Sequence, residues 1–360
     1  MKRLHFTVTN GLNHDQRMIR ICSSLAAAGY QVKLVGVENK ETLQPKPYAQ
    51  KRLSTGFKKG PGFYAVYQLR LFFYLLFIKT DLLCCIDLDT MLPVWLVAKL
   101  RGKKMLYDAH EYFSQQKEII TRPKVYRVWH WIERTFVPKF KHGYTVSESI
   151  ARAFKEKYGV DYAVIRNMPL LKTLPAPAPP PEKFILYQGA VNEARGLEFL
   201  IPAMKQVPVQ LHIYGDGNFM ETVKEMIRVN NLGDKVLLKG KVLPGELDRI
   251  TQSAYIGINL VENTGLNQYY SLANKFFDYL QNGIPQLSMN FPEYKKINDE
   301  WEVAILLDEL TEESIAGALN GLLNDEYRYT KLQQQCLAAR EILNWQEEEK
   351  KLLAFYKAIV

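Results

Sequence analysis

Short apolar runs of strand length alternate with longer amphipathic segments along almost the whole chain. Up to residue 172, strands are predicted at residues 4–8, 31–37, 82–86, 104–109, 143–146 and 162–167. After residue 181 the pattern starts again, with strands predicted at residues 183–190, 209–217, 235–240, 254–261, 284–289 and 303–307. Between the two series lies TLPAPAPPP, residues 173–181, whose five prolines cannot continue a helix or a central strand. This segment therefore marks a domain boundary.

Repeated strand–helix alternation predicts parallel sheets with helices on both faces. We therefore expect an α/β protein with two doubly wound domains that face each other across a cleft. In such sheets ligands bind beyond the carboxyl ends of the strands. Polar stretches follow the predicted strands at those ends: TNGLNHD, DAHE, SES, GAVNEARG and VENTG.

Size and composition agree with a two-domain globular protein. The chain has 360 residues, of which 47% are hydrophobic and 24% charged. Its longest apolar run, residues 71–78, is far too short to span a membrane, and no signal peptide is visible, so we expect a cytoplasmic protein. The four cysteines show no metal-ligand spacing and are expected to be buried free thiols.

Charge is distributed unevenly between the two halves. Residues 1–172 carry 29 Lys and Arg against 13 Asp and Glu, a balance of +16, whereas the remainder carries 18 against 25, a balance of −7. A basic half suggests an anionic partner: nucleic acid, a lipid surface or a phosphorylated substrate. RNA is disfavoured because the interleaved aromatic and basic pattern of common RNA-binding modules is missing from the sequence.

The segment GPGFYAVYQLRLFFYLLFIK, residues 60–79, is aromatic, apolar and bounded by cations. Two interpretations stay open. It is either a buried helix of the first domain or a helix whose exposed aromatic edge dips into anionic lipid. The second interpretation implies peripheral binding at the inner face of the cell membrane.

Asp87 and Asp89 in IDLDT form a DxD pair that could hold a divalent cation on a diphosphate. The following residues read as a helix, however, and capping by Asp89 or Thr90 explains that carboxylate more simply. We therefore expect no metal site.

Lys275 and Asp278 lie three residues apart in SLANKFFDYLQNGIP, which places them on one face of a short helix. A lysine in the first turn of a helix faces the positive end of the helix dipole, which is locally unfavourable. A bound anion would reverse that sign.

In their order along the chain, DAHE, TVSESIARAFKEKYGV, VIRN, GAVNEARGLEFLIPAM, LHIYGDG and NKFFDYLQNGIPQL resemble the GT-B-fold retaining glycosyltransferases of family 4. The resemblance covers nearly the whole chain. It implies a domain on the acceptor side over residues 1–172, a proline-rich linker at 173–181, and a nucleotide-sugar-binding domain at 182–340. It also implies a C-terminal helix, residues 341–360, that packs back on the first domain.

Carried over residue by residue, the resemblance assigns His110 to the reacting sugar, Arg195 to the diphosphate and Asp278 to the nucleotide ribose. Two family positions are lost, because an acid is replaced by Tyr270 and an arginine by Ala190. Lys275 is the expected replacement cation, helped by free backbone amides of residues 271–274. The remaining expected donor-site residues are Gly189, Gly215, Val242, Ser271, Leu272 and Asn274, and those on the acceptor side are Gly11, Asn13 and Glu111.

The expected function is transfer of a sugar from a nucleoside diphosphate sugar to a glycan or lipid-linked acceptor in cell-surface polysaccharide or glycolipid synthesis. No cofactor or metal is expected, and no nucleic acid partner. The alternatives are a non-catalytic nucleotide-sugar-binding protein and a nucleotide-sugar epimerase of the same fold.

Overall fold

The computed structural model describes residues 1–57, 59–174 and 182–360, which divide into two compact units. The first unit comprises Met1–Asn167 and Glu347–Val360, and the second comprises Met168–Gln346. The boundary expected at 172 thus falls a few residues earlier, and the expected C-terminal segment 341–360 is shared between the units. Most of the predicted linker, residues 175–181, lies outside the described residues.

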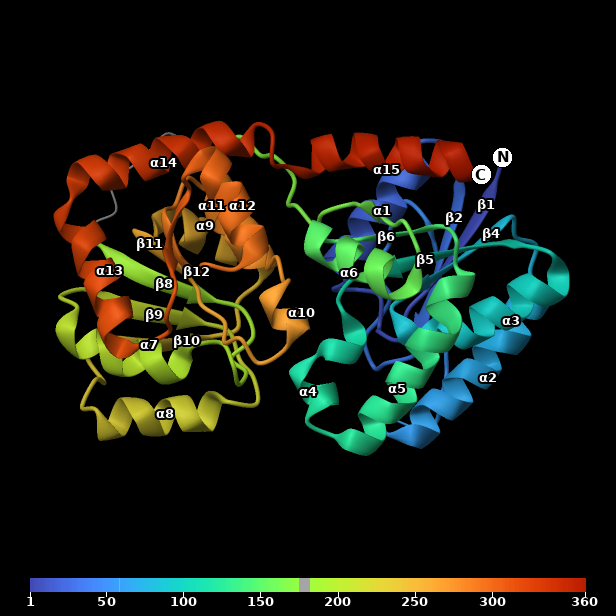
Figure 1. Cartoon of the computed structure of the whole chain (residues 1–360), viewed down its shortest axis with the longest axis horizontal. Coiled ribbons are helices and arrows are strands. Elements are labelled where there is room, and N and C mark those ends of the chain that lie inside the picture. The colour runs from blue at the N-terminus through green and yellow to red at the C-terminus, as the bar shows by residue number, and fades with distance from the viewer. Residues whose placement is uncertain (58, 175–181) are drawn as a thin grey trace. The chain divides into compact units, whose positions relative to one another are not determined.

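The first unit is built on a parallel sheet of seven strands in the order β3-β2-β1-β4-β5-β6-β7. Helices lie on both faces of this sheet (Figure 1). The strands are β1 (Arg3–Thr7), β2 (Gln31–Val37), β3 (Ala49–Leu53), β4 (Leu82–Ile86), β5 (Lys104–Ala109), β6 (Gly143–Thr145) and β7 (Ala163–Val164). The helices are α1 (Gln16–Ala27), α2 (Pro61–Phe77), α3 (Met91–Arg101), α4 (Lys117–Ile120), α5 (Pro123–Phe136), α6 (Glu148–Tyr158) and α15 (Trp345–Ile359). Short 3₁₀ turns cover Leu88–Thr90, Phe113–Gln115 and Val137–Lys139.

The second unit has a parallel sheet of six strands in the order β10-β9-β8-β11-β12-β13. The strands are β8 (Phe184–Gln188), β9 (Gln210–Tyr214), β10 (Val236–Gly240), β11 (Ile256–Asn259), β12 (Gln286–Met289) and β13 (Ala304–Leu307). The helices are α7 (Leu197–Ala203), α8 (Met220–Val229), α9 (Pro244–Ser253), α10 (Leu266–Tyr269), α11 (Asn274–Gln281), α12 (Pro292–Trp301), α13 (Glu312–Asn324) and α14 (Glu326–Arg340), with a 3₁₀ turn at Met204–Gln206. The expected α/β class with two doubly wound domains is confirmed.

Each sheet has one point at which the strand order reverses, between β1 and β4 in the first unit and between β8 and β11 in the second. Crevices form at such points beyond the carboxyl ends of the strands, where ligands of open α/β sheets bind. These two edges are therefore where the candidate residues have to be sought.

One strand was not predicted. β3, residues Ala49–Leu53, has the sequence AQKRL and pairs only with β2 at the edge of the sheet. An edge strand has one partner and half-exposed faces, so it needs no continuous apolar run. The hydrophobic pattern therefore does not predict this strand.

The C-terminal part of α15 packs on the first unit. The hydroxyl groups of Tyr356 and Tyr144 lie 3.2 Å apart, and the amide of Arg166 donates to Glu348 at 2.8 Å. Lys104 donates to the carbonyl of Ile359 at 2.7 Å. Residues about 200 positions apart in sequence thereby share one core.

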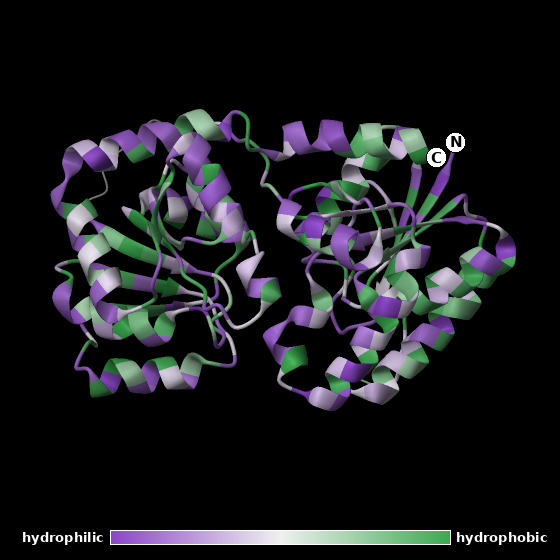
Figure 2. Cartoon of the chain, in the orientation of Figure 1, coloured by the Kyte–Doolittle hydropathy of each residue, from purple (hydrophilic) through white to green (hydrophobic). Residues whose placement is uncertain are grey.

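The hydrophobic pattern of α2 resolves into two stripes. Tyr67, Leu71 and Leu75 are fully buried, whereas Leu69, Phe73 and Phe77 are 58%, 51% and 79% exposed. Spacings of four residues place each set along one face of the helix, and Figure 2 marks the hydrophobic residues along it. The helix is therefore buried on one face and apolar on the exposed face as well.

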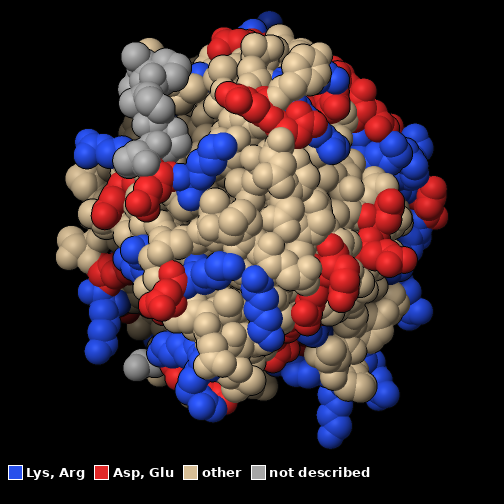
Figure 3. All heavy atoms as spheres, turned by 90° about the vertical axis from the view of Figure 1, so that its left-hand side faces the viewer, with Lys and Arg blue, Asp and Glu red and all other residues tan. Residues whose placement is uncertain are grey.

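All four cysteines are buried and free, as predicted. No helix within the described ranges has both the length and the apolar content needed to cross a bilayer. In Figure 3, which faces the side of α13 and α14, acidic and basic side chains are interspersed around uncharged surface.

Candidate active site

In the second unit, the predicted helix of Lys275 forms as α11, with Lys275 in its first turn. The lysine side chain is buried, and its Nζ has no hydrogen-bond partner within the described part of the chain. Instead, Nζ lies 4.0 Å from the centroid of the Tyr187 ring, a cation–π contact at the end of β8. The ring covers one side of the ammonium group but provides no compensating negative charge.

Burial lowers the pKa of Lys275 to about 7, because desolvation disfavours the charged form and the neighbouring charge of Arg195 acts in the same direction. Asp278 opposes this shift. Arg195 is itself half-buried and makes no hydrogen bond or ion pair with the residues that the structure describes. Two basic side chains therefore lie near each other with only Asp278 as a compensating charge, an arrangement that favours the binding of an anion.

The glycines expected at the donor site lie beside Lys275. Gly189, directly after β8, has a φ of 116°, and a side chain at this position would begin 3.9 Å from Cε of Lys275. At Gly215, directly after β9, a Cβ atom would lie 1.8 Å from the carbonyl oxygen of Gly189. Only glycine permits the two turns to approach this closely.

Asp278 is held by a short chain of hydrogen bonds. The Gln188 side-chain amide donates to Asp278 at 3.2 Å, and Thr251 donates its hydroxyl proton to Gln188 at 2.7 Å. Sequence reasoning selected Asp278 but missed Tyr187, Gln188 and Thr251. These lie inside a strand and a helix, where nothing in the local pattern separates them from core residues.

The predicted amide cradle at residues 271–274 is only partly available. The amide of Ser271 donates to the carbonyl of Gln268 at 3.2 Å, and that of Ala273 donates to the Tyr294 hydroxyl at 3.0 Å. The prediction that all four amides are free is therefore wrong, because the turn after α10 uses the amide of Ser271 to close itself and that of Ala273 to bond to α12.

The remaining expected donor-site residues occupy nearby loops. Leu272 is buried in the core of the unit, and Tyr270 lies beside Tyr269 with ring centroids 5.5 Å apart. Asn274 is the first residue of α11, and the Ser271 hydroxyl donates to Gln268. Val242 is half-buried in the loop between β10 and α9.

In the first unit, His110 lies just beyond the end of β5 and is tied to buried carboxylates. Its Nε2 is 3.1 Å from Oδ2 of Asp108, and its backbone amide donates to Oδ1 of Asp87 at 3.0 Å. Asp108 also accepts from Arg17 Nη2 at 2.9 Å. Although burial alone would lower it, the pKa of His110 is raised to about 9 by Asp108, with a smaller contribution from Asp87.

Sequence reasoning found His110 but not Arg17, Asp108 or Asp87 as its partners. Two signals were present. Asp108 lies two residues before His110, so their side chains start on the same face of the strand. Arg17 is a cation in the first turn of α1, the same unfavourable placement that identified Lys275.

The other residues expected on the acceptor side belong to the surrounding loops. Asn13 is buried and donates to Glu41 and to the carbonyl of Thr42, while its carbonyl oxygen accepts from the amide of Gln44. The carbonyl of Gly11 accepts from Arg52. Glu111 is exposed and accepts from Gln116 at 2.8 Å. Asn13 thus holds its loop in place, and its part in acceptor binding stays a prediction.

The prediction that Asp89 or Thr90 caps the following helix is wrong. A 3₁₀ turn precedes α3, and Thr90 at the N-cap position makes no side-chain capping bond. Its hydroxyl instead accepts from Thr7, and Asp89 accepts from Thr9. Burial raises the pKa of Asp89 to about 6, and that of Asp87 well above its ordinary value.

The described residues contain no cluster of three or more His, Cys, Asp or Glu side chains arranged for a metal ion. Metal-independent activity stays a prediction.

Two family models match the chain. The model "Glycosyl transferases group 1" matches residues 175–339, and "Glycosyltransferase Family 4" matches residues 16–168. Among curated proteins, no sequence matches.

Solved structures share the fold at low sequence identity. Sucrose-phosphate synthase from Thermosynechococcus elongatus superposes with a TM-score of 0.82 at 16% identity, covering 100% of this chain and 99% of that one. Anabaena HepE in complex with UDP-glucose has a TM-score of 0.77 at 11% identity, covering 100% of both chains. A TarM mutant from S. aureus, in complex with Fondaparinux, alpha-GlcNAc-glycerol and UDP, has a TM-score of 0.77 at 11% identity, covering 99% and 100%. The two parallel-sheet domains thus have the GT-B fold of these structures.

Proposed function

The chain belongs to the glycosyltransferases that these two family models describe, and from that premise we propose the reaction and substrates of this enzyme. It transfers a sugar, with retention of anomeric configuration, from a nucleoside diphosphate sugar to a glycan or lipid-linked acceptor. The acceptor belongs to the synthesis of cell-surface polysaccharide or glycolipid.

The observation that carries this proposal is the buried, unpartnered ammonium group of Lys275 beside Arg195. Burying a charge without a partner is costly, so such a group is kept for a ligand of opposite charge. A diphosphate has both the charge and the size to contact two cations, and Gly189, without a side chain beside Lys275, leaves room for it close to the backbone.

The chemistry follows from where charge develops. As the glycosidic bond breaks, the leaving diphosphate gains negative charge while the sugar becomes oxocarbenium-like. Lys275 and Arg195 would therefore interact more strongly with the transition state than with the bound donor, which is the condition for catalysis. Asp278, held by Gln188, would accept from ribose hydroxyls, whose charge hardly changes.

UDP-sugars are the first donors to test, since HepE and TarM are in complex with UDP or UDP-glucose. A thermal-shift panel of UDP-, GDP-, ADP- and CDP-sugars identifies the base. Ligand at about 100 times its dissociation constant stabilises the folded state by about 2.7 kcal/mol. The expected result is stabilisation by one class of nucleotide that is lost in Lys275→Ala and kept in Lys295→Ala, an exposed lysine paired with Asp299.

Transfer itself is tested with that donor and extracts containing glycolipid or polysaccharide acceptors, with the anomeric configuration of the product read by NMR. Transfer with retention supports the proposal, and inversion overturns the retaining mechanism. Binding without turnover would indicate a nucleotide-sugar-binding protein, and conversion of the donor sugar without acceptor would indicate an epimerase. Turnover that is abolished by EDTA and restored by Mn²⁺ would overturn metal independence.

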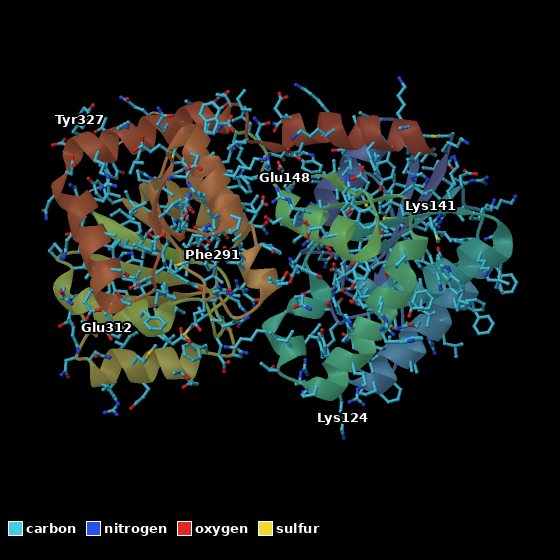
Figure 4. All side chains as sticks on the ribbon, in the orientation of Figure 1. Lys124, Lys141, Glu148, Phe291, Glu312 and Tyr327 are labelled. Carbon is cyan, nitrogen blue, oxygen red and sulfur yellow. The ribbon has the colours of Figure 1, made fainter. Side chains whose placement is uncertain are left out.

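Binding to an anionic membrane surface is part of the proposal. It is supported by the exposed apolar stripe of Leu69, Phe73 and Phe77 on α2 and by the positive charge of the first half of the chain. Exposed Arg70 and Lys79 flank this stripe, and Lys124 extends outward from the start of α5 (Figure 4). Basic residues near an anionic leaflet contribute about 1 kcal/mol each.

Vesicles containing phosphatidylserine are expected to bind the protein more strongly than neutral vesicles, and added salt is expected to weaken this binding. Phe73→Asp should reduce it. Tyr327→Asp, at an 83% exposed aromatic position on α14 labelled in Figure 4, should not. Equal partitioning onto both kinds of vesicle would discard the electrostatic account.

A further inference from the structure

Asp108 is a fully buried carboxylate that is shared by two cations. Its Oδ1 accepts from Arg17 Nη2 at 2.9 Å, and its Oδ2 lies 3.1 Å from Nε2 of His110. Neither Asp108 nor Arg17 is more than 4% exposed, whereas the His110 side chain is 17% exposed. The cluster therefore reaches solvent at the histidine.

Arg17 is fixed independently of His110. Its Nη1 donates to the carbonyl of Ile165 at 2.8 Å, and its guanidinium carbon lies 5.6 Å from the centre of the Tyr144 ring. The arginine is thus held from β5, β6 and the end of β7, and it holds Asp108 in turn. A carboxylate fixed on one oxygen by a rigid guanidinium offers its other oxygen in a defined direction.

The imidazole of His110 uses Nε2 for Asp108, and Nδ1 makes no hydrogen bond with any residue that the structure describes. The Asp108 carboxylate thus contacts both the Arg17 guanidinium and the His110 ring, and a proton on the ring would give the group a surplus positive charge. Other ionisable groups around the ring are Asp87, which accepts from the backbone amide, Asp89, and Glu111 next in sequence. Burial raises the pKa of Asp87 and Asp89, which reduces their negative charge.

We propose that Asp108 keeps His110 as an imidazolium ion and that Arg17 positions Asp108 for this, so that the Nδ1–H of His110 donates a hydrogen bond to a substrate oxygen and the histidine does not act as a base. This rests on the proposed transferase function for its role in catalysis, whereas the protonation of His110 stands independently of it. A histidine that is already protonated cannot accept the proton of an attacking hydroxyl. It can stabilise an oxygen that gains negative charge.

The first test follows the imidazole signals of the full chain by NMR, with histidines labelled with ¹⁵N and that of His110 identified by its loss in His110→Gln. His110 is expected to stay protonated at pH 8. His5, which is buried against Thr80 and whose pKa burial lowers to about 4, is expected to be neutral there and serves as the internal contrast. Titration of wild-type His110 near its ordinary value of 6.5 overturns the proposal without any variant.

Two variants should move this titration in opposite directions. Asp108→Asn removes the negative charge and should lower the titration midpoint of His110 by more than one pH unit. Arg17→Met removes a positive charge that disfavours the imidazolium and should raise the midpoint. Shifts in the same direction would overturn the proposal, since general damage to the fold cannot produce opposite signs. If either variant fails to fold, the titration of His110 in wild type and in Arg17→Lys, which keeps the positive charge, still tests the proposal.

The second test measures release of UDP from UDP-glucose against pH. In wild type, kcat should fall as pH rises through about 9, and in Asp108→Asn the fall should move to lower pH by the same amount as the NMR titration. The KM for the donor should change less than twofold, and the exposed His142→Gln should leave the profile unchanged. A profile that does not follow the His110 titration assigns the three residues to structure alone. If no donor is turned over, the transferase proposal fails while the titration still tests the protonation of His110.

Discussion

Each unit holds a basic side chain near the carboxyl ends of its strands, and the surroundings of the two side chains differ. His110 in the first unit is bonded to Asp108, so although burial opposes it, its pKa is raised to about 9. Lys275 in the second unit lies on the face of Tyr187, with the like charge of Arg195 and the opposite charge of Asp278 nearby, and burial lowers its pKa to about 7. Two buried basic side chains thus have pKa values that are shifted in opposite directions.

The difference shows what supplies the compensating charge. For His110 the fold supplies a carboxylate, and the charge is stable in the empty protein. For Lys275 the charge of Asp278 compensates only in part, so the empty protein is penalised, and a bound anion, as proposed, would relieve the penalty. A charge that is paired within the protein can position a side chain for reaction, and a charge that is paired only by a ligand can recognise that ligand.

The largest effect is expected when the ion pair between Arg17 and Asp108 in the first unit is broken. Asp108→Ala leaves the buried guanidinium of Arg17 without its carboxylate and is expected to destabilise the protein by about 3 to 5 kcal/mol, since an uncompensated buried charge remains. Urea denaturation of the full chain measures this loss. Asp161→Ala, which removes an 85% exposed partner of Lys155, serves as the control and should change stability by less than about 0.5 kcal/mol. A similar loss of stability in both variants would show that the Asp108 carboxylate does not compensate a buried charge.

The next effect removes the unpaired cation in the second unit. Lys275→Ala is expected to lower kcat/KM by about 10² to 10³, which corresponds to about 2.7 to 4 kcal/mol of transition-state stabilisation. At the same time it should stabilise the empty protein, because a buried uncompensated charge is gone. Steady-state kinetics and thermal unfolding without ligand check both signs. Wild-type kinetics in the variant would leave Arg195 as the sole cation on the diphosphate.

A pH series sharpens the comparison. The folded-state pKa of His110, about 9, lies above the ordinary value of 6.5, so its stabilisation is complete below pH 6.5 and is lost as pH rises through about 9. The folded-state pKa of Lys275, about 7, lies below the ordinary value of 10.5, so its penalty is complete below pH 7 and fades between pH 7 and 10.5.

Relative to wild type, His110→Gln should therefore lose most stability at pH 6, and Lys275→Met should gain most there. Both differences should shrink at higher pH, by up to about 1.4 kcal/mol per pH unit. Urea denaturation between pH 6 and 9.5 measures them. Differences of the same sign in the two variants would remove the basis of the comparison.

The smallest effect concerns the neighbour of Lys275. Asp278→Ala is expected to raise the donor KM about fivefold with kcat almost unchanged, because a hydrogen bond of about 1 kcal/mol that is equal in ground and transition state is lost. Asp299→Ala on α12, whose exposed carboxylate pairs with Lys295, is the matched control and should alter neither constant. A fall in kcat with unchanged KM would mean that Asp278 acts on the reacting charge.

Most of the fold could be predicted from the sequence because parallel strands buried on both faces read as continuous apolar runs. The predicted runs at 31–37, 82–86 and 104–109 coincide with β2, β4 and β5. β3 could not be predicted, since AQKRL lies at an edge and owes its extended form to its pairing with β2. The division of residues 341–360 between the two units was likewise invisible, because it depends on contacts such as Tyr356 with Tyr144.

The candidate site was predicted where a local rule was broken. Lys275 was selected as a cation at the wrong end of a helix, and Arg17, which breaks the same rule, was overlooked. Asp89 was misjudged because its bond to Thr9 joins residues 80 positions apart, whereas capping was the only local explanation.

The sequence by itself determined the two series of strands and helices and the residue types at their ends, because periodicity and dipole preference act over a few neighbouring positions. Only the tertiary structure decided the charge states that matter for chemistry. Arg17, Asp108 and His110 come from a helix, a strand and a loop, and Lys275 meets Tyr187 from a separate strand. Coulomb energies depend on the distance between such groups and on how much water remains around them. Both quantities exist only once distant parts of the chain have packed together.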